Sequence, residues 1–315
     1  MTNTYRRQFV KNISLISGIA LGLPSQAMSL FNGERSLKVN IFSKHLQFLN
    51  YGRMAEVAKM IGFDGVDLTV RPNGHVEPAN VQKDLPEAIT AIRNEGLSFE
   101  TITTAVEDAS DPVDRSVLET AAVLGVKTYR MNWFRYDQQV SMMDQLQSLQ
   151  KQVADLGVLN ERLGLIACYQ NHAGNLVGAS LWEVYELLKL SDPKFFGVQY
   201  DIRHATVEGG VSWPNGLRLV QSQVKSIVLK DFKWEKIGGK WILVNTPIGE
   251  GMVDFPAFFR LIRKYEIEVP VSLHLEYPLG GAEHGHRQLS CDQGIVFEAM
   301  KNDLNRVKQY WEESK

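Results

Sequence analysis

The sequence alternates short apolar segments with longer amphipathic segments, and the pair recurs eight times between residues 38 and 313. The short segments have the apolar and β-branched character of buried strands, and the longer ones carry apolar residues at helical spacing. Expected strands cover 38–43, 62–70, 98–103, 126–131, 164–169, 196–200, 225–229 and 269–275. Expected helices cover 51–61, 83–95, 112–124, 137–162, 179–189, 213–222, 254–265 and 292–313. Eight consecutive strand–helix units without a linker predict an α/β fold, a closed, single-domain (β/α)8 TIM barrel.

One insertion interrupts the repeat after the seventh strand. It contains the turn IGGK at 237–240 between the strand-like segments FKWEK and WILVN. A glycine pair between two such segments is typical of a β-hairpin. The hairpin is expected on the side of the barrel where active sites lie.

The first 27 residues differ from the rest and predict an export signal. A basic start is followed by the apolar run ISLISGIALGL and by small residues at Ser25 and Ala27. The apolar run is too short to span a bilayer comfortably, and the pair Arg6-Arg7 is similar to a twin-arginine signal. We therefore expect a periplasmic or otherwise exported protein whose residues 28–315 form the barrel, without a stable membrane anchor. An uncleaved anchor is the alternative.

The charge balance argues against nucleic acid as a partner. The chain has 34 Lys and Arg against 36 Asp and Glu, for a net charge of −2. A nucleic-acid-binding domain usually carries a clear basic excess. We expect a small-molecule partner, and oligomeric state stays open.

Polar residues gather where the expected strands end. The segment 195–209 runs as an apolar strand and then supplies Asp201, Arg203 and His204 in an expected loop. A carboxylate and an imidazole three residues apart form a plausible half of a metal or acid/base site. None of the seven histidines falls on an expected helix: His45, His75, His172, His204, His274, His284 and His286.

Other strand ends supply candidate catalytic and substrate-binding groups. Ser272, His274 and Glu276 alternate with apolar residues in the eighth strand, so they share one face. The candidate catalytic residues are Glu276, His274, His172 and Lys230. The candidate substrate-binding residues are His75, Arg71, Arg130, His204 and Trp133. For Arg130, pairing with Glu100 is an equal alternative to holding a substrate anion or hydroxyl.

These segments resemble one known family, the xylose isomerase-like TIM barrels, also called sugar phosphate isomerase/epimerases. The resemblance covers about residues 37–311. It is carried by the following segments: GFDGVDL, YQNHAG, VQYDIRHA, IVLKDF, IGEGMVDF and SLHLEY.

The resemblance implies a divalent cation, Mn²⁺, Mg²⁺, Co²⁺ or Zn²⁺, that polarises a sugar carbonyl while carboxylates move a proton. The residues matching its ligand positions are Asp201, Glu276, Gln170 and His204. Two positions depart from the family pattern: Gln170 stands in place of Glu and Val228 in place of His. An amide can offer an oxygen to a metal but cannot act as a general base, and valine can do neither.

The leading hypothesis is an exported sugar or keto-sugar isomerase or epimerase that abstracts a proton next to a carbonyl with the help of a metal. The missing second glutamate motivates an alternative, a lyase or hydrolase of 3-keto-glycosides, because elimination needs one base and a held oxyanion. A third hypothesis is a non-catalytic carbohydrate-binding barrel, with Trp133, Phe134 and Trp213 stacking on sugar faces.

Overall fold

The computed structural model describes residues 36–315, and residues 38–315 form one compact unit. The expected export signal at 1–27 lies outside the described residues. Within the described part of the chain, no helix has the length and apolar character needed to cross a membrane.

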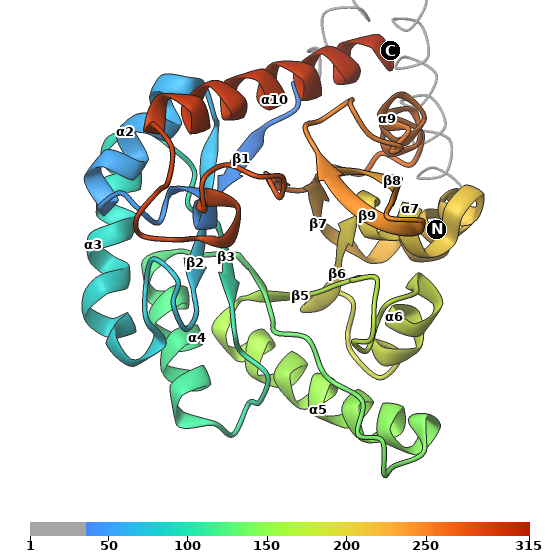
Figure 1. Cartoon of the computed structure of the whole chain (residues 1–315). Coiled ribbons are helices and arrows are strands. Elements are labelled where there is room, and N and C mark those ends of the chain that lie inside the picture. The colour runs from blue at the N-terminus through green and yellow to red at the C-terminus, as the bar shows by residue number, and fades with distance from the viewer. Residues whose placement is uncertain (1–35) are drawn as a thin grey trace, which may run out of the picture. The chain divides into compact units, whose positions relative to one another are not determined.

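Eight parallel strands close into a barrel, as the repeat predicts (Figure 1). The order around the barrel is β1-β10-β7-β6-β5-β4-β3-β2, and the first and last strands close it with Val39 opposite Val271. The barrel strands are β1 (Val39–Phe42), β2 (Gly65–Val70), β3 (Thr101–Thr104), β4 (Thr128–Arg130), β5 (Ile166–Gln170), β6 (Phe196–Asp201), β7 (Val224–Leu229) and β10 (Val271–Leu273). Nearly every strand residue is buried, because side chains on one face fill the barrel and those on the other meet the helices.

Helices surround the barrel (Figure 1), and all of them except α7 overlap the predicted ranges. They are α2 (Tyr51–Ile61), α3 (Val81–Asn94), α4 (Pro112–Leu124), α5 (Met142–Leu163), α6 (Leu181–Leu187), α7 (Ile202–Gly209), α8 (Trp213–Val220), α9 (Phe255–Lys264) and α10 (Gln293–Glu313). In α4, the Asp111 side chain accepts from the first free amides, and Gly125 ends the helix at φ 91°.

The segment after β6 is helical, and the expectation of a loop there is wrong. Asp201 is the N-cap of α7, and its carboxylate accepts the His204 backbone amide at 3.0 Å. This cap satisfies an amide that the helix leaves free, so a helix starts directly from the strand end. His204 therefore lies on a helix, and β6 is followed by two α-helices, α7 and α8, rather than one.

The insertion after β7 is a hairpin, as predicted: β8 (Asp231–Ile237) pairs antiparallel with β9 (Lys240–Thr246). At its base the Asp231 carboxylate accepts four backbone amides, from Phe232, Gly249, Gly251 and Val253, at 2.8 to 3.1 Å. One buried carboxylate thus folds the return segment 247–253 against the strand end.

We expect Asp231→Ala to lower the free energy of unfolding by about 2–4 kcal/mol, because it leaves several buried amides unsatisfied. Urea unfolding followed by circular dichroism measures the change. Asp254→Ala, which removes a carboxylate that caps a single exposed amide at the start of α9, is the control and should cost about 1 kcal/mol. Equal losses in both variants would contradict the anchoring role.

Candidate active site

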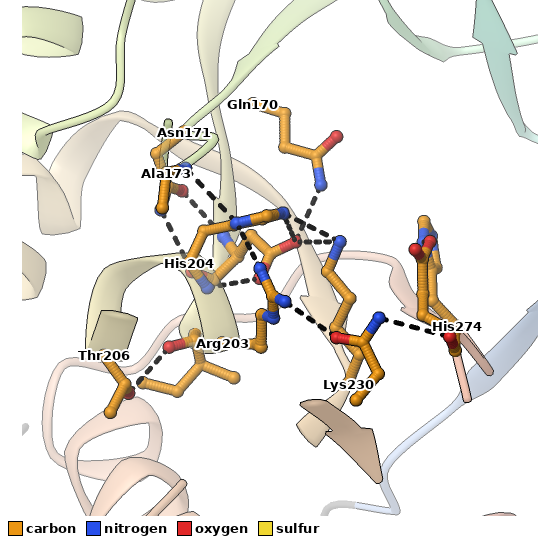
Figure 2. Close-up of polar contacts among 12 residues, drawn as sticks. Gln170, Asn171, Ala173, Arg203, His204, Thr206, Lys230 and His274 are labelled. Atoms are coloured by element: carbon orange, nitrogen blue, oxygen red, sulfur yellow. Dashed lines mark hydrogen bonds and ion pairs between the residues drawn. The ribbon is translucent and has the colours of Figure 1, made fainter. Parts of the chain in front are cut away.

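Asp201 lies at the centre of a buried polar network at the end of β6. It is completely buried. Its Oδ2 accepts the Gln170 side-chain amide at 2.8 Å and pairs with Lys230 Nζ at 3.1 Å (Figure 2). Asn171 holds its backbone from both sides, accepting the Asp201 amide at 2.8 Å and donating to its carbonyl at 3.0 Å. The carboxylate is therefore saturated by groups that end β5, β6 and β7.

Lys230 follows β7 directly and is 5% exposed. Its Nζ lies 3.1 Å from Asp201 Oδ2 and 2.9 Å from His204 Nε2. A buried ion pair of this kind is stable only with both partners present, since either charge alone would be left unsolvated. Lys230 thus places a cation between two of the side chains predicted to bind a metal.

The hydrogen bonds of His204 determine which ring nitrogen carries a proton. Its Nδ1 faces the Ala173 amide at 3.2 Å and Arg203 Nη1 at 2.9 Å (Figure 2). A backbone amide and a guanidinium can only donate, so Nδ1 must be the unprotonated, accepting nitrogen. Burial, followed by the nearby Lys230 charge, holds the pKa of His204 well below its usual range. The ring is therefore neutral, with its proton on Nε2.

Glu276 lies just beyond β10, the strand that pairs with β7, and 29% of its side chain is exposed. Its Oε1 lies 3.0 Å from Lys44 Nζ and 3.9 Å from His274 Nδ1. Burial raises the pKa of Glu276, but Lys230, His274 and Lys44 outweigh it and hold the pKa well below its usual range. Glu276 is thus an ionised carboxylate that still reaches solvent.

His274 is buried beside Glu276 and stacks on Phe42 with ring centroids 4.0 Å apart. Burial lowers its pKa to about 4, so the ring is neutral at physiological pH. Its Nε2 has no hydrogen-bond partner among the described residues. Packing therefore holds the ring in place, and its Nε2 can form a hydrogen bond with another group.

His172, Trp133 and Arg130 form a stacked group next to His204. The His172 ring centroid lies 3.9 Å from that of His204 and 4.7 Å from that of Trp133. The Arg130 guanidinium lies 4.0 Å from the Trp133 ring centre. Burial, followed by the Lys230 charge, lowers the pKa of His172 to about 4, so it is a neutral imidazole.

Arg130 points into the barrel rather than toward Glu100, which is exposed. Its Nη2 reaches only the Thr104 carbonyl at 3.4 Å, and its Nε and Nη1 have no partner in the described chain. The carboxylate that attracts it most is Asp67, which accepts hydrogen bonds from the Thr103 and Ser272 hydroxyls, and Glu276 attracts it more weakly. Arg130 thus keeps unused donors.

Two predicted substrate-binding residues lie outside the Asp201 network. Arg71 is half-buried, with its guanidinium 5.5 Å from the Phe42 ring centre, and Asp67 and Glu276 are its attracting charges. His75 is buried against the Tyr51 ring, with centroids 6.3 Å apart, and burial lowers its pKa to about 4. No contact joins His75 to Asp201 or Glu276 among the described residues, so its binding role stays a prediction.

The four side chains predicted to bind a metal do not fit one as arranged. Gln170 turns its amide nitrogen toward Asp201, Glu276 pairs with Lys44, and the neutral His204 has no lone pair at Nε2. Metal-bound histidines show the reverse pattern, binding through one nitrogen and donating from the other. Within residues 36–315, no cluster of three or more His, Cys, Asp or Glu side chains could hold a metal ion.

Two residues of this site were not predicted from the sequence. Lys44 pairs with Glu276, and its position directly after the first strand was a signal that could have revealed it. Asn245 in β9 accepts from Arg203 Nη2 at 2.7 Å and donates to the Glu276 carbonyl at 3.1 Å. Nothing in the sequence indicates these hydrogen bonds, because only the folded structure brings the hairpin next to Arg203 and Glu276. Asn245 thus links α7 to the segment that follows β10.

Solved structures of similar fold include several sugar epimerases. The chain is similar to D-psicose 3-epimerase with D-tagatose from Clostridium cellulolyticum H10 (13% identity, TM-score 0.64, 87% of this chain and 99% of that chain). It is equally similar to 3-keto-D-glucoside 4-epimerase from E. coli (15% identity, TM-score 0.64, 87% and 100%). A xylose isomerase-like TIM barrel protein from Mycobacterium smegmatis, in complex with magnesium, also matches (12% identity, TM-score 0.59, 87% and 97%).

A search of curated protein sequences found no match. A family profile does match, described as xylose isomerase-like TIM barrel, over residues 55–292. That range covers most of the barrel, from α2 to the segment before α10. The chain therefore belongs to the xylose isomerase-like TIM barrel family.

Proposed function

We propose that the protein is an exported sugar or keto-sugar isomerase or epimerase that removes a proton from a carbon next to a carbonyl group. The observation that carries the proposal is the ionised, solvent-reaching carboxylate of Glu276 on the same rim as the donor-rich pair Lys230 and His204. Such a reaction needs a base beside the C–H bond and donors at the oxygen that gains negative charge. The fold that sugar epimerases share supports the assignment.

In this proposal Glu276 accepts the proton, and Lys44 and His274 hold its carboxylate in place. His172 is the second proton-transfer group, because its ring is neutral and its Nδ1 has no partner in the described chain. Trp133 and Arg130 border His172 and supply an aromatic face and free donors to a sugar. Return of the proton to the same or the opposite face gives the isomer or the epimer.

Gln170 favours one second candidate, a lyase or hydrolase of 3-keto-glycosides. Its side chain stands at the end of β5, where the family resemblance implies a second carboxylate, and an amide cannot act as a base. A single base suffices to start elimination, since the electrons left by the proton expel the leaving group at the neighbouring carbon. This reaction and epimerisation share the first step.

Proton exchange tests the proposal. The mature protein is incubated in D₂O with a panel of ketoses and 3-keto-glycosides, with and without Mn²⁺, and deuterium in the recovered sugar is measured by mass spectrometry. We expect deuterium at one carbon next to the carbonyl. Release of the aglycone from 3-keto-glycosides would instead identify the lyase. Sugar binding in calorimetry without exchange anywhere in the panel would contradict both and leave a binding protein.

A further inference from the structure

We propose that Lys230 Nζ and the Nε2–H of His204 form a built-in oxyanion site that takes the place of a divalent cation in this barrel. The ligand is the oxygen of a sugar enolate or enediolate, so the inference rests on the proposed proton abstraction. Its basis is the contacts of two buried side chains that approach each other to 2.9 Å.

Hydrogen-bond donors outnumber acceptors around His204. The ring is approached at Nδ1 by the Ala173 amide and by Arg203, and at Nε2 by Lys230. A neutral imidazole has one accepting nitrogen, and Nδ1 is already taken by two groups that can only donate. Lys230 Nζ and the Nε2 proton therefore face each other. The nearest acceptor, Asp201 Oδ2, lies 3.1 Å from Lys230 Nζ but 3.8 Å from His204 Nε2, so the Nε2 proton has no acceptor at hydrogen-bond distance. A buried donor without an acceptor costs free energy, and an oxygen placed against both would relieve that cost.

The surroundings of Lys230 and His204 carry an excess of positive charge. Five cationic side chains line this end of the barrel: Lys44, Arg71, Arg130, Arg203 and Lys230. The anionic side chains that attract them are three: Asp67, Asp201 and Glu276. Asp231, the buried carboxylate directly after Lys230, is a fourth anion at this end of the barrel, so the cations outnumber the anions by one in a largely buried region. Such a field stabilises negative charge on a bound molecule much more strongly than water would.

This geometry matches the proposed reaction. When Glu276 takes the proton, the C–H bond breaks and its electron pair moves into the new C=C bond while the carbonyl π electrons move onto oxygen. No oxidant, reductant or further reactant is needed. The oxygen gains charge against two fixed donors, and return of the proton from Glu276 to carbon reverses the shift. Asp201 and Gln170 act as positioning residues that keep Lys230 in place.

The experiment combines metal content with turnover. The purified protein is dialysed against Mn²⁺, Mg²⁺, Co²⁺ and Zn²⁺ in turn, then passed over a desalting column and analysed for bound metal. We expect no stoichiometric metal, and proton exchange that survives EDTA. Lys230→Met should lower kcat by about 100- to 1,000-fold, because it removes one oxyanion donor. Lys225→Met, at a half-buried lysine near the start of β7, is the control and should keep its activity.

Nitrogen NMR of the histidines gives a test that needs no substrate. We expect the ¹⁵N shifts of His204 to show a protonated Nε2 and an unprotonated Nδ1. One stoichiometric metal ion per chain that is lost in Asp201→Asn, or the opposite tautomer, would overturn the inference even if proton exchange is found. Absence of exchange with every sugar would overturn the proposed function, whereas metal content and tautomer still decide the inference.

Discussion

Glu276→Gln is expected to lower kcat for proton exchange by about 100- to 10,000-fold, the usual contribution of a general base. The substitution preserves shape but leaves an amide that cannot accept the proton at neutral pH. KM should change less, because the groups proposed to bind the sugar, Trp133 and Arg130, lie on the other side of the rim. Deuterium incorporation at saturating sugar gives kcat, and its dependence on sugar concentration gives KM.

A matched control separates this effect from a general loss of charge. Glu298→Gln makes the same chemical change at an exposed position of α10 and should leave kcat unaltered. Thermal unfolding of both variants checks that Lys44, which loses its ion-pair partner in Glu276→Gln, does not disturb the fold. Full activity of Glu276→Gln would assign the proton transfer to His172 or His274 instead.

Asp201→Ala is expected to destabilise the protein by about 3–5 kcal/mol, the usual result of leaving one member of a buried ion pair alone. The change leaves the Lys230 ammonium, the Gln170 amide and the His204 backbone amide in the first turn of α7 without their partner. It is therefore larger than the loss of a helix cap alone, about 1 kcal/mol. Urea unfolding at pH 7 measures the difference in the free energy of unfolding.

Two further variants define the cause of that loss. Asp192→Ala removes an exposed carboxylate that accepts the Lys194 amide just before β6, and should cost about 1 kcal/mol or less. The double variant Asp201→Ala with Lys230→Met removes both charges and should recover part of the lost stability. If it is no more stable than Asp201→Ala, the stranded lysine is not the source of the destabilisation.

The fold could be predicted from the sequence because each barrel strand is buried on both faces and reads as an apolar run. Helix ends were also predictable where a local signal exists, as at Gly62 and Gly125, which adopt left-handed conformations. The helix α7 was not, because its start depends on the Asp201 cap, and an aspartate after a strand fits a loop equally well. Propensity alone does not separate these possibilities.

The sequence predicts which residues lie at the site much better than which of them contact one another. Asp201, His204, Lys230 and Gln170 were all expected near one another, since the carboxyl ends of neighbouring parallel strands meet. Lys230 contacts Asp201 and His204, and Glu276 pairs with Lys44. These pairings depend on the directions of the side chains, which the spacing of residues in the sequence does not determine. The hydrogen bonds of Asn245 depend on how the hairpin folds over the rim.

The position of Lys230 affects how a newly made molecule of this protein becomes active. The cation is the side chain of Lys230, so it is present as soon as the chain is synthesised. It reaches its position when β6 and β7 pair. On the inference drawn above, no loading step follows folding, and the wrong ion cannot be incorporated. The active fraction of a preparation would then equal its folded fraction, whatever the ion supply of the compartment in which it folds.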